Sequence, residues 1–313
     1  MAYETASASS VNDLIDKLRI FALANGWTVD FNGSSGLGTG IAVLLHKGGV
    51  YVGFATNTAT GTSEDPGPRV LTYYYTGPYS SGSGPLAQAG HSGTTDTNNM
   101  PGPFQAYHFF ASGTYLHVVV EVAPGSFRHF GVGVLEKAGS VTTGVYAHGS
   151  FWNYATVYVS SFLSSFNSMP FDDQAYNNVA KSTVIRCDSD AISPRHGRVV
   201  DSASGSVCGG YRRSSAGTNS AAYVSGLAHF GPSALTGRAP LLPLFCSVFR
   251  PSGNLSIIGA PPDLRAVRID NIAPGELITL GPDDWKVFPA IRKNGVSGQE
   301  NSNAYGYAYR VVP

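Results

Sequence analysis

Hydrophobic and polar residues alternate most regularly in residues 116–122, LHVVVEV, near the middle of the chain. Successive side chains of a strand point to opposite faces, so this period of two predicts a strand. The β-branched valines favour the same structure. The turn sequence Ala123-Pro124-Gly125 ends the strand, and the apolar run GVGV at 131–134 supplies a partner. We therefore predict a central hairpin, in which Gly131 and Gly133 mark a close backbone approach or a bulge.

Near the N-terminus the apolar spacing is that of a helix. The apolar positions recur three and four residues apart, at Val11, Leu14, Ile15, Leu18 and Ala22. Ser10 is suited to cap the first turn, and Gly26 ends the helix. The apolar stripe must cover a sheet, and we expect that sheet to contain residues 116–122. The predicted fold class is α+β and β-dominated: an antiparallel sheet packed on one N-terminal helix, with a large loop-rich β insertion.

Three strands are expected directly after the helix, at residues 27–31, 41–46 and 50–55, as a meander packed on it. The glycine-rich turn at 33–40 contains GLGTG, which resembles a phosphate-binding loop. Such a loop must open a helix, whose N-terminus holds the phosphate. A strand pattern follows here, so we predict an ordinary turn.

The most aromatic predicted strand is residues 70–76, VLTYYYT. Its alternation places Tyr73 and Tyr75 on the face opposite Tyr74. Three interpretations remain open: packing at a sheet edge, a subunit contact, or a platform for sugar binding. Because aromatic residues are enriched at the centres of interfaces, we take Tyr73, Tyr74, Tyr75 and Met100 as the candidate interface residues.

Two polar segments, residues 1–9 and 77–103, contain few large apolar side chains. A loop as long as residues 77–103 inside a compact domain is usually functional or disordered. We expect residues 1–9 to be an extended arm. Both segments are predicted to become ordered only when a neighbouring subunit covers them.

The composition changes along the chain and suggests three parts. Residues 1–154 are predicted to form the helix and the antiparallel core, and residues 155–275 a loop-rich β insertion. Within the insertion we expect short strands at 182–186, 221–224 and 244–249. Residues 276–313 are expected to return to the main sheet as C-terminal strands.

Charged residues are sparse, at 13% of the chain against about 25% in average soluble proteins. The formal net charge is zero, which gives no electrostatic basis for binding nucleic acid. Such a surface suits a protein whose neighbours cover much of it. The polar start MAYETASASS predicts no secretory signal, and no apolar run is long enough to span a membrane.

Residues that could carry chemistry do not form a recognisable motif. His108, His117 and His129 flank the central hairpin, but zinc spacings are absent, and structural hydrogen bonding is the preferred interpretation. The carboxylate pairs are Asp172-Asp173, Asp188 with Asp190, and Asp283-Asp284. The three cysteines, Cys187, Cys208 and Cys246, are expected to be free thiols in a chain folded in the cytoplasm. We predict no catalytic site, no metal and no cofactor.

Three segments resemble virion structural proteins of tailed bacteriophages. They are the start MAYETASASSVNDLIDKLRIFALANGWTVD, the central segment YHFFASGTYLHVVVEVAPGSFRHFGVGVLEKAG, and the ending DDWKVFPAIRKN with NSNAYGYAYRVV. The resemblance implies a structural, non-enzymatic component of the virion, in the tail, baseplate or neck. Its partners would be other copies of itself and other phage virion proteins. The alternative function is a tail protein that binds a receptor or a host-surface glycan.

Overall fold

The computed structural model describes residues 1–59, 67–138, 144–150, 170–171, 183–189, 192–198, 207–209, 232–249, 255–293 and 305–311. Residues 187–189, 192–198, 207–209, 247–249 and 255–256 are described by their backbone alone. Strands hold 53% of the described residues and helix 8%, and one N-terminal helix packs on antiparallel sheets. The predicted fold class is therefore confirmed.

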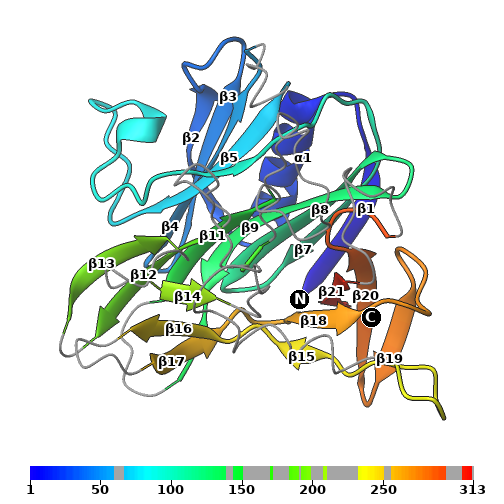
Figure 1. The fold of residues 1–313 in the computed structure, drawn as a ribbon. Coiled ribbons are helices and arrows are strands. Elements are labelled where there is room, and N and C mark those ends of the chain that lie inside the picture. Colours follow the sequence, from blue (N-terminus) through cyan, green and yellow to red (C-terminus); the bar gives the residue numbers. More distant parts are fainter. Residues whose placement is uncertain are drawn as a thin grey trace, which may run out of the picture.

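The central sheet has seven antiparallel strands in the order β1-β7-β8-β9-β11-β12-β13 (Figure 1). Its hairpin β8–β9 is the one predicted from the alternation of residues 116–122. The strands are β1 Ala2–Ala8, β7 Phe104–Ala111, β8 Tyr115–Ala123, β9 Ser126–Val134, β11 Val145–Gly149, β12 Thr183–Ser189 and β13 Ile192–Arg198.

A second sheet, the meander sheet, follows the chain in the order β2-β3-β4-β5-β6, as expected for its first three strands. Its strands are β2 Thr28–Ser34, β3 Ile41–Lys47, β4 Val50–Asn57, β5 Arg69–Tyr75 and β6 Thr95–Thr97. Because β3 follows the GLGTG turn directly, the turn opens a strand and has no helix N-terminus to hold a phosphate.

Two further sheets lie in the second half of the chain. The C-terminal sheet has the order β15-β18-β21-β20-β19, and the small sheet has the order β10-β17-β16-β14. The C-terminal strands are β15 Leu242–Pro243, β18 Leu264–Arg268, β19 Leu277–Leu280, β20 Asp283–Pro289 and β21 Tyr305–Val311. The small sheet consists of β10 Glu136–Lys137, β14 Val207–Gly209, β16 Cys246–Phe249 and β17 Leu255–Ala260.

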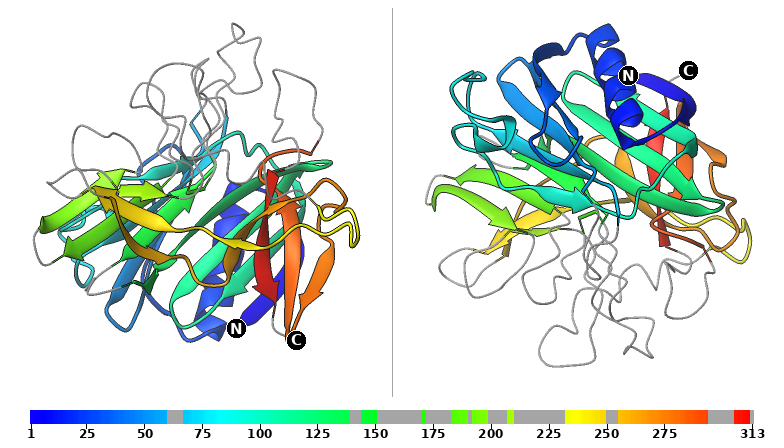
Figure 2. Two further views of the ribbon diagram at one scale, coloured as in Figure 1. Left: turned by 60° about the horizontal axis from the view of Figure 1, so that its bottom comes forward. Right: turned by 90° about the horizontal axis from the view of Figure 1, so that it is seen from above.

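The C-terminal strands do not join the main sheet, as the sequence had suggested they would. They form a sheet of their own that packs across one face of the central sheet, and the helix covers the opposite face (Figure 2). A backbone bond of 2.7 Å from Phe127 N to Ile291 O connects the two layers. The predicted strand at 221–224 lies outside the described residues.

The helix α1 (Val11–Ala24) begins at Ser10, whose side chain accepts a hydrogen bond from Asp13 N, as the sequence predicted. Its apolar stripe packs between the meander sheet and the central sheet. The helix-side core is made of buried residues from α1, the meander sheet and one face of the central sheet, among them Leu14, Leu18, Phe54, Leu116, Val118 and Val120. The expected contact between the helix and the face of residues 116–122 is thus confirmed.

Replacing Leu14 or Leu18 with alanine should lower the free energy of unfolding by about 2–5 kcal/mol, the usual range for a buried leucine. Both side chains are at most 1% exposed. Ile20→Ala is the matched control, because Ile20 is 53% exposed on the same helix and should change stability by less than about 0.5 kcal/mol. Urea unfolding measures all three. If the leucine variants lose no more stability than Ile20→Ala, the apolar stripe of α1 contributes little to the free energy of unfolding.

The arm expected at residues 1–9 is a strand of the central sheet. β1 pairs with β7 in antiparallel register, from Ala2 opposite Ala111 to Ala8 opposite Phe104. Backbone hydrogen bonds therefore hold this polar segment to its own chain, although it contributes little apolar area. The expectation that a neighbour must cover it is wrong.

Residues 77–103 also pack on their own chain, with the short 3-10 helix η1 (Pro85–Ala87) and strand β6. Met100 is buried in the helix-side core, Tyr79 and Leu86 pack on the meander sheet, and polar bonds hold much of the rest. The buried Gln88 side chain accepts from Ser80 N at 2.8 Å and donates to Ser83 O and Gly84 O at 3.0 Å. Thr72 bonds Thr95 through their hydroxyls. The prediction of a segment that orders only on a neighbour is corrected here as well.

Candidate functional site between the central and C-terminal sheets

Four histidines lie on one face of the central sheet, each on a different strand. They are His108 on β7, His117 on β8, His129 on β9 and His148 on β11. The strand period of two places His117 opposite to Leu116 and Val118, which face the helix. The register then sets their neighbours: His117 pairs with Gly131, and Gly131 pairs with His148.

Gly131 and Gly133 make room for large side chains on this face, as the sequence had suggested for a close approach. A Cβ atom at Gly131 would lie 2.8 Å from His148 Nε2 and 2.9 Å from His117 Cδ2. A Cβ atom at Gly133 would lie 2.6 Å from the Tyr146 hydroxyl. The rings of His117 and His148 therefore meet above the glycine strand, with their centroids 5.3 Å apart.

Three of the histidines join separate strands through hydrogen bonds. His129 Nε2 lies 2.8 Å from Pro289 O, and its Nδ1 lies 2.8 Å from the Tyr309 hydroxyl. A carbonyl only accepts, so Nε2 carries the proton and Nδ1 accepts from Tyr309. His117 Nε2 bonds the Tyr146 hydroxyl at 2.6 Å. His108 Nδ1 bonds the Tyr3 hydroxyl at 2.8 Å, which attaches β1 to β7.

We name this group the histidine seam. It consists of His108, His117, His129, His148, Tyr115, Tyr146 and Tyr309. Within the described part of the chain, His117 Nδ1 and both ring nitrogens of His148 are buried without a hydrogen-bond partner. On burial such groups lose their hydrogen bonds to water and gain none in return, so they lower the stability of the folded seam.

Burial keeps these side chains neutral at pH 7. Desolvation lowers the pKa of His117 to about 3, and desolvation followed by the charge of Lys286 lowers that of His108 to about 4. The pKa of His129 is lowered to about 4, first by desolvation. Burial lowers the pKa of His148 well below its usual value and raises that of the Tyr146 hydroxyl. A general acid or base works best with a pKa near the working pH, and burial moves the pKa values of these groups away from it. Cohesion between strands is what the geometry supports.

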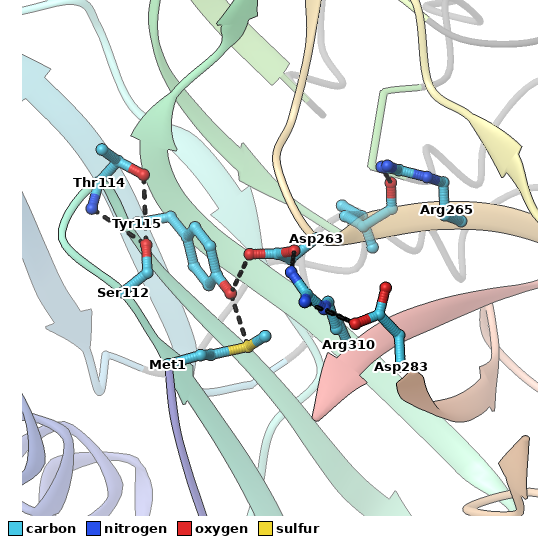
Figure 3. A network of polar contacts seen from close by, with 9 residues as sticks. Met1, Ser112, Thr114, Tyr115, Asp263, Arg265, Asp283 and Arg310 are labelled. Atoms are coloured by element: carbon cyan, nitrogen blue, oxygen red, sulfur yellow. Dashed lines mark hydrogen bonds and ion pairs between the residues drawn. The ribbon is translucent and has the colours of Figure 1, made fainter. Parts of the chain in front are cut away.

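A charged network continues from Tyr115 at the edge of the seam (Figure 3). The Tyr115 hydroxyl donates to Asp263 Oδ2 at 3.0 Å and contacts Met1 Sδ at 2.8 Å. Arg310 donates from Nη1 to Asp263 Oδ1 at 3.2 Å and from Nε to Asp283 Oδ1 at 2.8 Å. Its pKa is raised, mainly by the bond to Asp263. The network therefore clamps β20, β21 and the turn before β18 to the start of β8.

The candidate interface residues are buried in the interior of the protein. Tyr73 and Tyr75 pack in one buried cluster of the meander sheet, while Tyr74 and Met100 belong to the helix-side core. All four are at most 3% exposed. The alternation predicted for the tyrosines is confirmed, but they offer no surface to a subunit or a sugar. Packing is the interpretation that stands, although β5 lies between β4 and β6 and not at the expected sheet edge.

The carboxylate pairs do not converge on a cleft where they are described. Asp283 binds Arg310, and Asp284 accepts from the Thr279 hydroxyl at 2.7 Å. Asp172-Asp173, Asp190 and the side chain of Asp188 lie outside the described residues, as do the side chains of Cys187 and Cys208. Cys246 is a buried free thiol. Among the described residues, no group of three or more His, Cys, Asp or Glu could hold a metal ion.

Sequence reasoning missed His148, Tyr309 and Arg310 as members of this site. The one local signal is the alternation in VYAHG, which places Tyr146 and His148 on the same face.

In the described part of the chain, no helix is long and apolar enough to cross a membrane. Comparison of the chain with protein-family models gives no match, and comparison with curated protein sequences gives none either.

Proposed function

We propose that the protein is a structural subunit of a tailed-phage virion, in the tail, baseplate or neck. It acts by self-association and by contacts with other virion proteins, after folding in the host cytoplasm. The proposal starts from the sequence resemblance described above. One structural observation supports it most directly, an exposed apolar strand at the edge of the C-terminal sheet.

This edge strand is β19, which pairs only with β20 among the described strands. Leu277 and Leu280 are 52% and 56% exposed, and no charged residue lies between them. Natural proteins usually protect a free edge with charges, proline or a covering loop, because unpaired peptide groups recruit another strand. An unprotected apolar edge therefore favours pairing with a strand of a neighbouring subunit.

The loop before β15 contributes to the same side of the C-terminal sheet, because Ala239 and Leu241 pack in one cluster with Ile278 of β19. This loop also contains Leu235, which is 97% exposed. The low overall charge leaves little electrostatic repulsion between copies of the chain. Both features support association through this side of the C-terminal sheet.

The double variant Leu277→Lys/Leu280→Lys should weaken self-association at least about tenfold, because two charges would have to be buried in the contact. Ile20→Lys/Leu23→Lys is the matched control, since it places the same charges at exposed apolar positions of α1. Sedimentation velocity over a range of concentrations measures the change. An unchanged association constant in the β19 variant would contradict the role of this edge.

The virion assignment needs a separate measurement. Mass spectrometry of density-purified phage particles should detect peptides of this chain at a fixed ratio to other virion proteins. Their absence from particles would overturn the virion assignment, while leaving any self-association through β19 to be explained otherwise.

A further inference from the structure

The two faces of the central sheet differ in their chemistry. The face toward α1 is lined mainly by apolar and aromatic side chains, and it also holds the buried Arg128, which pairs with Val120. The opposite face carries all four histidines of the seam. The packing on the histidine face should therefore depend on pH more strongly than the packing on the face toward α1.

The C-terminal sheet covers the seam mainly through side chains. Tyr309 stacks on His129 with ring centroids 5.8 Å apart and lies edge-on to His117 at the same distance. Phe288 approaches His108 to 4.6 Å between centroids. The ladders of the C-terminal sheet run within that sheet, so parting the two layers leaves them intact. Parting breaks the backbone bond from Phe127 N to Ile291 O, at the isolated bridge between Ser126 and Arg292.

We propose that the histidine seam is an acid-sensitive joint: as the pH falls, its histidines take up protons and the C-terminal sheet separates from the central sheet, while α1 and the meander sheet stay packed. The joint is a property of the single chain. It does not depend on the virion assignment.

Protonation favours the open state because, among the described residues, no negatively charged group in the closed seam is free to stabilise a protonated histidine. The titratable or charged groups around the seam are Tyr3, Tyr115, Arg128, Glu136, Tyr146, Cys246, Asp263, Lys286, Tyr307, Tyr309 and Arg310. Arg128 and Lys286 are positive and oppose protonation. Of the two carboxylates, Asp263 is already bonded to Tyr115 and Arg310, and Glu136 acts on Tyr115. Protonating both His117 and His148 would also place like charges on rings 5.3 Å apart.

The direction of the pH dependence follows from linkage. Each histidine has a lower pKa when closed than when exposed, where it returns to about 6.5. The open state therefore binds more protons below about pH 6.5, and closure weakens as the pH falls toward about 4. Each histidine that is protonated only in the open state raises the opening constant about tenfold per pH unit. Two or more acting together give a steep transition.

Cys246 supplies a probe of the opening, because it lies on β16 and is fully buried in the core that Tyr146 shares with the C-terminal sheet. We would measure its reaction with 4,4′-dithiodipyridine, which reacts with thiols in acid as well as at neutral pH. Peptide mass spectrometry separates Cys246 from Cys187 and Cys208. The rate is divided by that of the urea-unfolded chain at the same pH, which gives a protection factor.

Between about pH 7 and about pH 4.5 the protection of Cys246 should fall at least about 100-fold. Hydrogen exchange in α1, corrected for the intrinsic rate at each pH, should remain protected over this range. Loss of both protections at one pH would show global acid unfolding and overturn the joint, as would a protection factor for Cys246 that does not change.

The variant His117→Phe/His148→Phe keeps two rings in place and removes two proton sites, so it should retain protection to a pH at least about one unit lower. His148→Phe alone should show a smaller shift in the same direction and serves if the double variant folds poorly. His46→Gln, which removes the partly exposed histidine bonded to Asp30 on the meander sheet, should leave the profile unchanged. A profile that is the same in the wild type and the His148→Phe variant would contradict the proposal.

Discussion

Replacing Gly131 with valine should leave a chain that no longer folds. A Cβ atom at this position would lie 2.6 Å from Leu116 O, an atom of the paired strand's backbone that no rotamer change can move. The two γ-carbons of valine would add to the crowding against His117 and His148. Overpacking of a core usually costs about 1–3 kcal/mol. Because the obstructing atom is backbone, we expect a larger loss, comparable with the whole stability of about 5–15 kcal/mol typical of a native protein.

Gly113→Val is the matched control for this experiment. A Cβ atom at Gly113 meets nothing within 4 Å, so valine there should change the free energy of unfolding by less than about 1 kcal/mol. Urea unfolding followed by tryptophan fluorescence compares the variants. If the Gly131→Val variant unfolds cooperatively at a urea midpoint near that of the wild type, the side chains of β8, β9 and β11 are not closely packed around Gly131.

Tyr309→Ala is expected to have an effect of similar size. Tyr309 is 1% exposed and stacks on Phe110 with ring centroids 4.8 Å apart. Truncating a buried aromatic side chain costs about 3–5 kcal/mol. The change also leaves His129 Nδ1 buried without its partner, which adds about 1–3 kcal/mol. Together these losses reach about 4–8 kcal/mol and detach the C-terminal sheet from the central one.

Tyr309→Phe separates the two contributions, because it keeps the ring and removes only the hydroxyl. We expect a loss of about 1–3 kcal/mol for the orphaned imidazole nitrogen. Tyr79→Phe provides the comparison at a partly buried ring that follows β5 and packs against the meander sheet. If Tyr309→Phe and Tyr79→Phe have equal denaturant midpoints, the bond between Tyr309 and His129 contributes nothing measurable.

The proposed assembly role and the proposed acid-sensitive joint place different demands on the C-terminal sheet. Its outer edge, β19, would meet a neighbouring subunit, while its inner face closes the histidine seam. Separation of this sheet in acid would then change the position of the assembly edge relative to the rest of the chain. Comparing self-association at neutral and acid pH, with and without the β19 variant, tests this link.

Local patterns along the chain were enough to predict several elements correctly. Residues 116–122 alternate because their two faces meet different cores, and the helix stripe recurs with a helical period because one side is buried. Tyr73 and Tyr75 fall opposite Tyr74 for the same reason. Gly131 signalled a close approach, since a glycine within an apolar strand has few other uses. Each of these signals depends on residues at most a few positions away.

The contacts between distant segments could not be predicted from local patterns and became visible in the folded chain. Residues 1–9 are too polar to predict burial, yet backbone pairing with β7 makes them a strand. Residues 77–103 fold through hydrogen bonds of Gln88 and the threonines, which composition does not reveal. His129 and Tyr309 are 180 residues apart, and His117 reaches His148 only through the register of β8, β9 and β11. Register and long-range pairing arise from the packing of whole sheets, so no local pattern along the chain encodes them.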